Sequence, residues 1–244
     1  MPGPQKQVRS SGWAPYWAPY VSFLLAVELS GRVTEPFAAI FFVLRVIVPL
    51  GLFSYFLLRN DYPELRGSRW GAWTLADVAV GLVGAVLWVA PFLLFDSLRP
   101  SEPGFDRGQL GPGGEGFAQV LRAIGYVAVT PFVEELFVRS WLLRYVEVAD
   151  TRRSFRTVPI AHFTWRSFLI VMVWLVISHT FWWEYPVMFG WSLLTMAWFY
   201  YRKHLAPLVL VHAVTNGAIF AFVLAFDGAF RDASGVPISL WFFL

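Results

Sequence analysis

The sequence predicts an all-α protein, a polytopic bundle of transmembrane helices, and three observations lead to this fold class. Hydrophobic residues make up 57% of the 244 residues and charged residues only 14%, whereas about a quarter of an ordinary soluble domain is charged. The mean hydropathy is +0.57. Apolar runs long enough to cross a hydrocarbon core of ~30 Å recur along the chain. We expect about seven spans, with eight as the alternative, in a single integral membrane domain over residues 1–244.

The predicted spans follow one another along the chain with mostly short connections. They cover residues 16–30, 36–58, 71–95, 117–145, 167–181, 186–201 and 206–226. The longest connection, residues 96–116, is rich in Gly and Pro and is expected to be a flexible outer loop. The terminal stretch ISLWFFL is too short to span and is expected to rest at the membrane interface.

The distribution of Lys and Arg predicts a cytoplasmic N-terminus. With seven crossings in that orientation, the inside loops hold twelve Lys and Arg residues and the outside loops hold four, as the positive-inside rule requires. The basic connection over residues 146–165 then lies on the cytoplasmic side. The first apolar run has no small-residue cleavage site, so we interpret it as an anchor.

Composition also excludes several classes of site and partner. The chain has no cysteine, which rules out a disulfide framework, a thiol nucleophile and a Cys-ligated metal. The net charge of the chain is only +3, and the basic residues of the chain cluster in the predicted loops. The pI of 9.3 therefore reflects membrane topology, and no nucleic acid is expected as a partner. No feature points to an oligomeric state.

Two adjacent carboxylates, Glu134 and Glu135, lie in the middle of the fourth predicted span. A charge at that depth costs ~2.5–3.5 kcal/mol on insertion scales. Arg139 is four residues after Glu135, so the two share a helix face and can pair, while Glu134 is rotated by about 100°. Pro131 removes a backbone donor and is expected to distort the helix and make room for water. Glu134 is thus a candidate general base; the alternative is a purely structural Arg–Glu pair.

Two later spans also carry polar side chains at depth. His212 and Asn216 are four residues apart on the seventh span, and both can donate hydrogen bonds toward one point, as an oxyanion hole requires. Alone, such a pair is more typical of an interhelical hydrogen bond. His179 ends the apolar run of the fifth span. A lone histidine there is more often a satisfied core residue, but together with Glu134 it could hold and polarise a water molecule.

Other intramembrane charges favour structural roles. Arg45 and Asp77 each lie well inside a span and are expected to form an ion pair with each other. Arg122 lies near a span end, where its long side chain can reach the interface. The chain contains no HExxH zinc motif and no GxSxG nucleophile turn. With these two types of hydrolase excluded, the remaining mechanism is a glutamate that activates water, with or without a metal.

At these residues the chain resembles the CPBP family, the CAAX protease and bacteriocin-processing membrane proteins, which include the Rce1-type CAAX prenyl endopeptidases. The family motifs EExxxR, FxxxH and HxxxN correspond, in chain order, to Glu134, Glu135 and Arg139, to His179, and to His212 and Asn216. The second motif is matched only in part, because Leu175 stands where the family has an aromatic residue. The resembling region, residues 117–226, is the expected catalytic core.

The resemblance implies an intramembrane glutamate endopeptidase that acts on a membrane-associated protein or peptide within the lipid bilayer, without cofactor or metal. It implies that Glu134 activates water with the help of His179, and that His212 and Asn216 form the oxyanion hole. Glu135 and Arg139 would support the site. Stretches such as VEELFVRSWLLRY and LVLVHAVTN are also similar to the exosortase-associated CAAX protease-related subgroup, which implies a bacterial inner membrane.

Three alternatives stay open at this point. A zinc-dependent peptidase would use Glu134, His179 and His212 as ligands, a workable catalytic set. A non-catalytic membrane binding or assembly protein would use the same polar cavity to hold a ligand or a partner. A transporter is the third, although the sequence shows no inverted repeat that would favour it.

Overall fold

The protein is an all-helical bundle, as the sequence predicts. The computed structural model describes residues 12–33, 36–66, 71–101, 104–179 and 181–244. Within these ranges the only β-type pairing is an isolated bridge between Arg231 and Pro237. Lys6, Arg9 and Arg69, three of the basic residues behind the topology prediction, lie outside the described residues.

Each predicted span corresponds to a helix or to a continuous helical stretch. The helices are α1 (Ala14–Arg32), α2 (Phe37–Leu58), α3 (Ala72–Leu94), α4 (Glu115–Ala123), α5 (Thr130–Glu135), α6 (Leu143–Val146), α7 (Trp165–Ile177), α8 (Tyr185–Arg202) and α9 (Leu205–Phe226). Two π-helical segments, Ile124–Val129 and Leu136–Leu142, join α4, α5 and α6 into one long helix.

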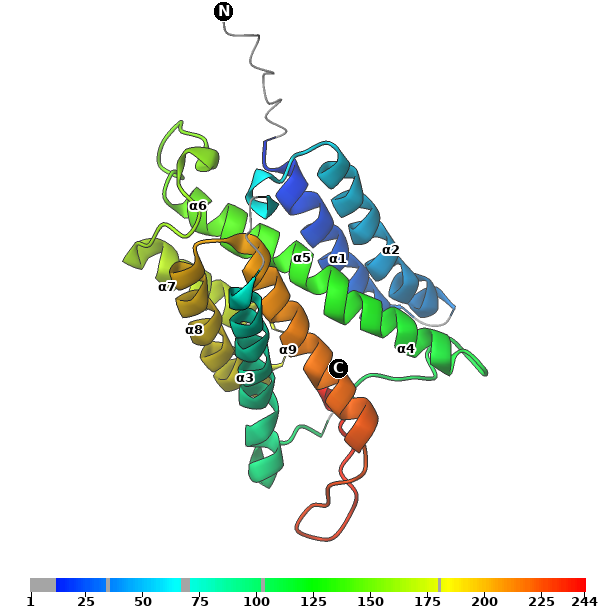
Figure 1. Ribbon diagram of the computed structural model, residues 1–244. Coiled ribbons are helices and arrows are strands. Elements are labelled where there is room, and N and C mark those ends of the chain that lie inside the picture. The colour runs from blue at the N-terminus through cyan, green and yellow to red at the C-terminus, as the bar shows by residue number, and fades with distance from the viewer. Residues whose placement is uncertain (1–11, 34–35, 67–70, 102–103, 180) are drawn as a thin grey trace, which may run out of the picture.

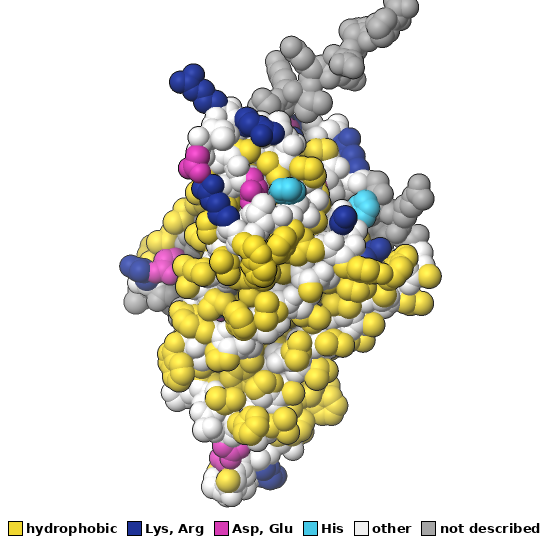
Figure 2. Space-filling view, turned by 90° about the vertical axis from the view of Figure 1, so that its left-hand side faces the viewer, with side chains coloured by type: hydrophobic (Ala, Val, Ile, Leu, Met, Phe, Trp, Pro, Cys, Tyr) yellow, Lys and Arg dark blue, Asp and Glu magenta, His cyan; other side chains and the backbone are white. Residues whose placement is uncertain are grey.

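The helices identify an integral membrane protein. Among the described residues, four stretches are long and apolar enough to cross a membrane: α2, α3, the long helix Glu115–Val146, and α9. The helix α7 is apolar but has only 13 residues, so the count of seven crossings stays a prediction. Figure 2 shows hydrophobic side chains over most of one face, with most of its Lys and Arg side chains gathered toward the upper end.

The long helix passes between two groups of helices. The hairpin of α1 and α2 packs on one side of it, and α3, α7, α8 and α9 lie on the other (Figure 1). The helices α3 and α9 approach closely because α3 presents glycines at their contact, and small residues let helix backbones come together. A Cβ atom on Gly84 would lie 2.7 Å from Thr215 Oγ1. This close packing fixes the position of α9, and thus of its polar residues, along the axis of α3.

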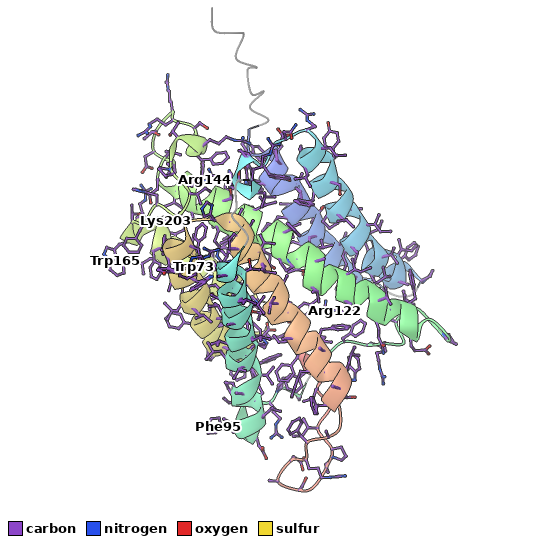
Figure 3. All side chains as sticks on the ribbon, in the orientation of Figure 1. Trp73, Phe95, Arg122, Arg144, Trp165 and Lys203 are labelled. Atoms are coloured by element: carbon purple, nitrogen blue, oxygen red, sulfur yellow. The ribbon has the colours of Figure 1, made fainter. Side chains whose placement is uncertain are left out.

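Ion pairs gather at one end of the bundle, where Figure 3 labels Arg144, Trp73 and Lys203. There Asp77 accepts hydrogen bonds from Arg202 Nε at 3.0 Å and Nη2 at 3.1 Å. The predicted pair of Asp77 with Arg45 is therefore wrong. Asp77 is near the start of α3, beside the end of α8, whereas Arg45 is on α2, across the long helix.

The outer loop and the terminal stretch pack together instead of lying loose. The backbone N–H of Phe105 donates to the carbonyl of Trp241 at 3.1 Å. Gly104 has a φ of +74°, and a Cβ atom there would overlap the backbone of Trp241 and Phe242. Leu240 and Phe243 are buried. The aromatic residues of ISLWFFL thus fill space between the outer loop and the end of α3, and the place of this stretch at the membrane interface stays a prediction.

Candidate active site

The two glutamates stand on a short α-helical segment between two π-helical ones. The helix α5 ends at Glu135 and is flanked by the π segments Ile124–Val129 and Leu136–Leu142. A π turn widens the helix and breaks its regular register, and such turns are common at functional sites. The irregularity predicted near Pro131 is therefore present, on both sides of the glutamate pair.

Glu135 is fully buried and is held by two cationic or polar partners. Its Oε1 accepts a hydrogen bond from Arg139 Nη1 at 3.1 Å, and it lies 2.8 Å from His212 Nδ1. Arg139 Nη2 in turn donates to Thr195 Oγ1 at 3.0 Å. The predicted pairing of Glu135 with Arg139 is confirmed. Its link to His212 was not expected from the sequence.

Glu134 has the opposite environment from its neighbour. Its side chain is 23% exposed. Its Oε2 lies 4.0 Å from His212 Nε2, at the outer limit of an ion-pair distance. It points into a cavity, whereas the side chain of Glu135 is 0% exposed. The arginine thus neutralises one carboxylate of the pair and leaves the other accessible, as the four-residue spacing indicated.

The cavity brings the four predicted catalytic residues together. It has a volume of about 720 Å³, within the range of small-molecule and peptide pockets, and Glu134, His179, His212 and Asn216 all line it. These residues come from α5, from the segment after α7, and from α9. Their convergence from three separate parts of the chain is the main structural finding about the site.

His179 reaches the cavity because α7 is short. The helix ends at Ile177, so His179 lies just beyond it, with Nδ1 3.1 Å from the carbonyl oxygen of Leu175. When Nδ1–H donates this bond, Nε2 is left as an acceptor. The aromatic neighbour that the family motif places at Leu175 is supplied here by Trp88 of α3, whose ring centroid is 5.6 Å from that of His179.

His212 and Asn216 occupy successive turns of α9 and are both oriented by the protein. The edge of Trp191 contacts the His212 ring, with 4.7 Å between centroids. Asn216 Nδ2 donates to the carbonyl of Tyr126, inside the first π segment, at 2.7 Å. An amide nitrogen carries two hydrogens, so one donor of Asn216 remains for a ligand. His212, bound to Glu135 through Nδ1, can donate from Nε2 when its ring is protonated.

The cavity contains charged residues that sequence reasoning assigned elsewhere. Arg45 was expected to pair with Asp77, and Arg122 was expected to reach the interface, yet both line the cavity, as does Glu184. A signal was present in the sequence: no acidic residue stands three or four positions from either arginine. Neither can therefore form the usual ion pair along its own helix.

No metal-binding cluster is apparent in the part of the chain that the structure describes. Within those residues, no group of three or more His, Asp or Glu side chains is arranged to hold a metal ion. The set proposed for zinc, namely Glu134, His179 and His212, lines one cavity, but His212 is already bound to Glu135 through one of its two ring nitrogens.

One comparison with known proteins gives a match. Residues 116–218 match the family model described as type II CAAX prenyl endopeptidase Rce1-like. The matched region begins with the long helix and ends within α9, and it contains all six residues of the sequence motifs. The match confirms the family resemblance; the narrower exosortase-associated subgroup stays a prediction. Comparisons with curated proteins and with solved structures gave no significant match.

Proposed function

We propose that this chain, whose motif-bearing region is of the Rce1-like family, is an intramembrane endopeptidase in which Glu134 activates the hydrolytic water. One observation carries the proposal. Two neighbouring glutamates have opposite environments, one locked in a buried ion pair and the other open to a cavity that also holds His179, His212 and Asn216. Among the described residues, this second, accessible carboxylate forms no ion pair with Arg or Lys that would explain the cost of a charge at this depth.

The reaction is the addition of water to a peptide bond. A water molecule between Glu134 and His179 Nε2 gives a proton to the carboxylate as its oxygen attacks the carbonyl carbon. A tetrahedral intermediate forms. The C–N bond then breaks, and Glu134 passes the proton to the leaving amine, so that the enzyme returns to its starting state. Histidine here orients and polarises the water through its free acceptor nitrogen.

The developing oxyanion needs donors that are already in place. Asn216 offers its second amide hydrogen, and its side chain is held by the Tyr126 carbonyl. His212 offers Nε2–H when its ring carries both protons, and its Nδ1 is held 2.8 Å from Glu135 Oε1. Preorganised donors of this kind contribute about 10²–10³ in rate each. The Glu135–Arg139–Thr195 network keeps the His212 ring from rotating away.

The substrate is a membrane-associated protein or peptide, because the cavity lies among apolar helices and is lined by apolar α1 residues such as Phe23 and Leu24 as well as by the catalytic set. The exosortase-associated subgroup would place the protein in a bacterial inner membrane. The charge distribution favours a cytoplasmic N-terminus.

The orientation can be tested on the exposed basic loop. In an Arg153→Cys variant of this cysteine-free chain, a membrane-impermeant thiol reagent is expected to label the protein only when it reaches the cytoplasmic side. Labelling of intact cells or spheroplasts from outside would reverse the topology.

The enzymatic proposal can be tested in cells before a substrate is known. Membrane proteomes of wild-type and deletion cells are compared to find a protein whose processing is lost. Wild-type protein is expected to restore that processing, Glu134→Gln is expected to fail, and Asn216→Ala is expected to slow it by about 10²–10³. Full restoration by Glu134→Gln would replace the peptidase with a binding or assembly protein. Loss of activity with chelators, regained with zinc, would select the zinc-dependent mechanism.

A further inference from the structure

Two arginines in the catalytic cavity form no close ion pair with any described residue. Arg45 on α2 and Arg122 on α4 both line it, and Figure 3 shows Arg122 at the opposite end of the long helix from Arg144. Within the described residues, neither guanidinium lies within 4.0 Å of an acidic oxygen. The Nε of Arg122 is buried and has no hydrogen-bond partner in the described part of the chain.

The contacts that the two arginines do make are aromatic. The guanidinium carbon of Arg45 lies 4.0 Å from the ring centroid of Phe42. That of Arg122 lies 5.1 Å from Tyr126 and 5.8 Å from Phe105. An aromatic face attracts a cation, but it leaves most of the five N–H donors of a guanidinium unused. The aromatic rings therefore hold the side chains in position without satisfying them.

Both side chains carry a positive charge and line the same cavity, so they repel each other. The acidic groups that face this part of the cavity are Glu184, which interacts with Arg122 beyond ion-pair distance, and Asp106 of the outer loop. Two like charges, both half-buried in an apolar setting, are expensive unless an anion joins them. No acidic side chain among the described residues comes close enough to either guanidinium to form that ion pair.

We infer that Arg45 and Arg122 form an oxyanion-binding subsite of the catalytic cavity and that its ligand is a carboxylate of the peptide substrate. A guanidinium matches the planar, two-oxygen geometry of a carboxylate and binds it through paired N–H bonds. The carboxylate comes from the end of the peptide or from an acidic side chain. The inference deepens the proposed function and rests on it for the identity of the occupant as a substrate.

The location favours a peptide over a lipid headgroup as the occupant. Both arginines face the interior cavity that holds Glu134, so whatever fills the catalytic cavity meets them. A lipid phosphate would have to displace the substrate from that space. A peptide carboxylate instead fixes the distance between a charged group and the bond at Glu134, which gives the enzyme a way to select its cleavage position.

The test uses peptide binding by the full chain in phosphatidylcholine nanodiscs. Three mixed libraries of short apolar peptides are offered: one with free carboxyl termini, one with amidated termini, and one amidated with a single internal Glu. Retained peptides are counted by mass spectrometry after filtration. The experiment is run in parallel on Glu134→Gln, so that retention is read without cleavage. Carboxylate-bearing peptides are expected to be retained about ten- to a hundredfold more than neutral ones.

Three variants separate the subsite from general charge effects. Arg45→Gln and Arg122→Gln are expected to abolish the preference for carboxylates, each without lowering the unfolding temperature, because each removes an unpaired charge. Arg107→Gln is the matched control: it removes an exposed positive charge from the outer loop, beside Trp241. It is expected to keep the preference.

Several outcomes would overturn the inference. Equal retention of charged and neutral peptides, retention of no peptide, or loss of the preference in Arg107→Gln would each do so. So would marked unfolding of both arginine variants, which would give these residues a structural role. Arginine-dependent binding of phosphatidylglycerol over phosphatidylcholine, without any peptide preference, would assign the subsite to lipid. The library that is retained identifies the source of the carboxylate.

The two proposals can fail separately. Carboxylate-dependent retention by a chain that cleaves nothing would leave the subsite standing and refute the peptidase. Cleavage that depends on Glu134 but shows no carboxylate preference would do the reverse.

Discussion

The buried and half-buried charges of this bundle fall into two groups, which differ in whether each charge has an ion-pair partner. Toward one end and in the centre, each charge has a partner: Arg202 with Asp77, Arg144 with Glu64, and Arg139 with Glu135. In the cavity, Glu134, Arg45 and Arg122 make no ion pair of comparable closeness with Arg, Lys, Asp or Glu among the described residues. Both groups lose hydration free energy when they leave water, but only in the first group does an ion pair within the protein offset that loss.

This difference separates charges with a structural role from charges with a functional one. A paired charge joins helices, and its removal leaves an uncompensated partner behind. An unpaired charge contributes nothing to folding, so its presence needs a ligand or a reaction to explain it. The account therefore predicts that substitutions in the two groups have opposite effects: the first group lowers stability, and the second lowers binding or catalysis.

The largest loss of stability is expected for Glu135→Gln. The change leaves the buried Arg139 uncompensated and weakens the bond to His212, which should lower the free energy of unfolding by about 3–5 kcal/mol. Thermal unfolding in detergent measures this, with Glu134→Gln as the matched control one position away. Equal unfolding temperatures for the two variants would show that Glu135 is no more important for stability than Glu134.

A smaller loss is expected for Asp77→Asn. Arg202 is 13% exposed and can turn toward the solvent or the headgroups, so the cost should be about 1.5–3 kcal/mol, that of hydrogen bonds to a charge. The matched control is Asp96→Asn, because Asp96 is half exposed in its contact with Arg99 and should change stability by less than ~0.5 kcal/mol. Unfolding temperatures that coincide would show that the Asp77 pair is not stabilising.

The smallest expected effect concerns pH and Glu184, in the connection between α7 and α8. Burial raises the pKa of Glu184 to about 7, against the opposing influence of a backbone hydrogen bond at Phe181 and of Arg122. The neutral form is favoured in the folded protein. The stabilisation that comes from protonated Glu184 is fully present below the ordinary pKa of 4.5, and it is lost as the pH rises through the folded-state pKa of about 7.

Wild-type protein should therefore lose about 1–2 kcal/mol of stability between pH 5 and 8, relative to Glu184→Gln. Unfolding temperatures of both proteins across this range measure the difference. The same pH profile for both would show that Glu184 does not titrate in this window.

Local spacing predicted much of this molecule, and long-range packing decided the rest. The apolar runs located the helices, and the four-residue spacing of Glu135 and Arg139 correctly separated the two glutamates. The partner of Asp77 was missed because it depends on which helix ends meet, and no local pattern encodes that. A distortion near Pro131 was predicted, but its π-helical form and the second π segment, Leu136–Leu142, were not, since they reflect the packing of the long helix against its neighbours.

The site shows the same limit. Spacing along one helix placed His212 and Asn216 on a common face, but it could not show that His212 binds Glu135 or that Asn216 binds the Tyr126 carbonyl. The environment of Arg45 is likewise a property of the assembled cavity, although the lack of an acidic residue one turn away was visible in the sequence.

The central claim is that two adjacent glutamates divide catalysis and stability between them, and one measurement tests it most directly. Single-turnover cleavage of the substrate found by the proteome comparison is followed with purified Glu134→Gln in nanodiscs, and the unfolding temperature is measured on the same sample. The account predicts no detectable cleavage at an unfolding temperature equal to that of the wild type. Cleavage within tenfold of the wild-type rate by a folded Glu134→Gln protein would contradict it.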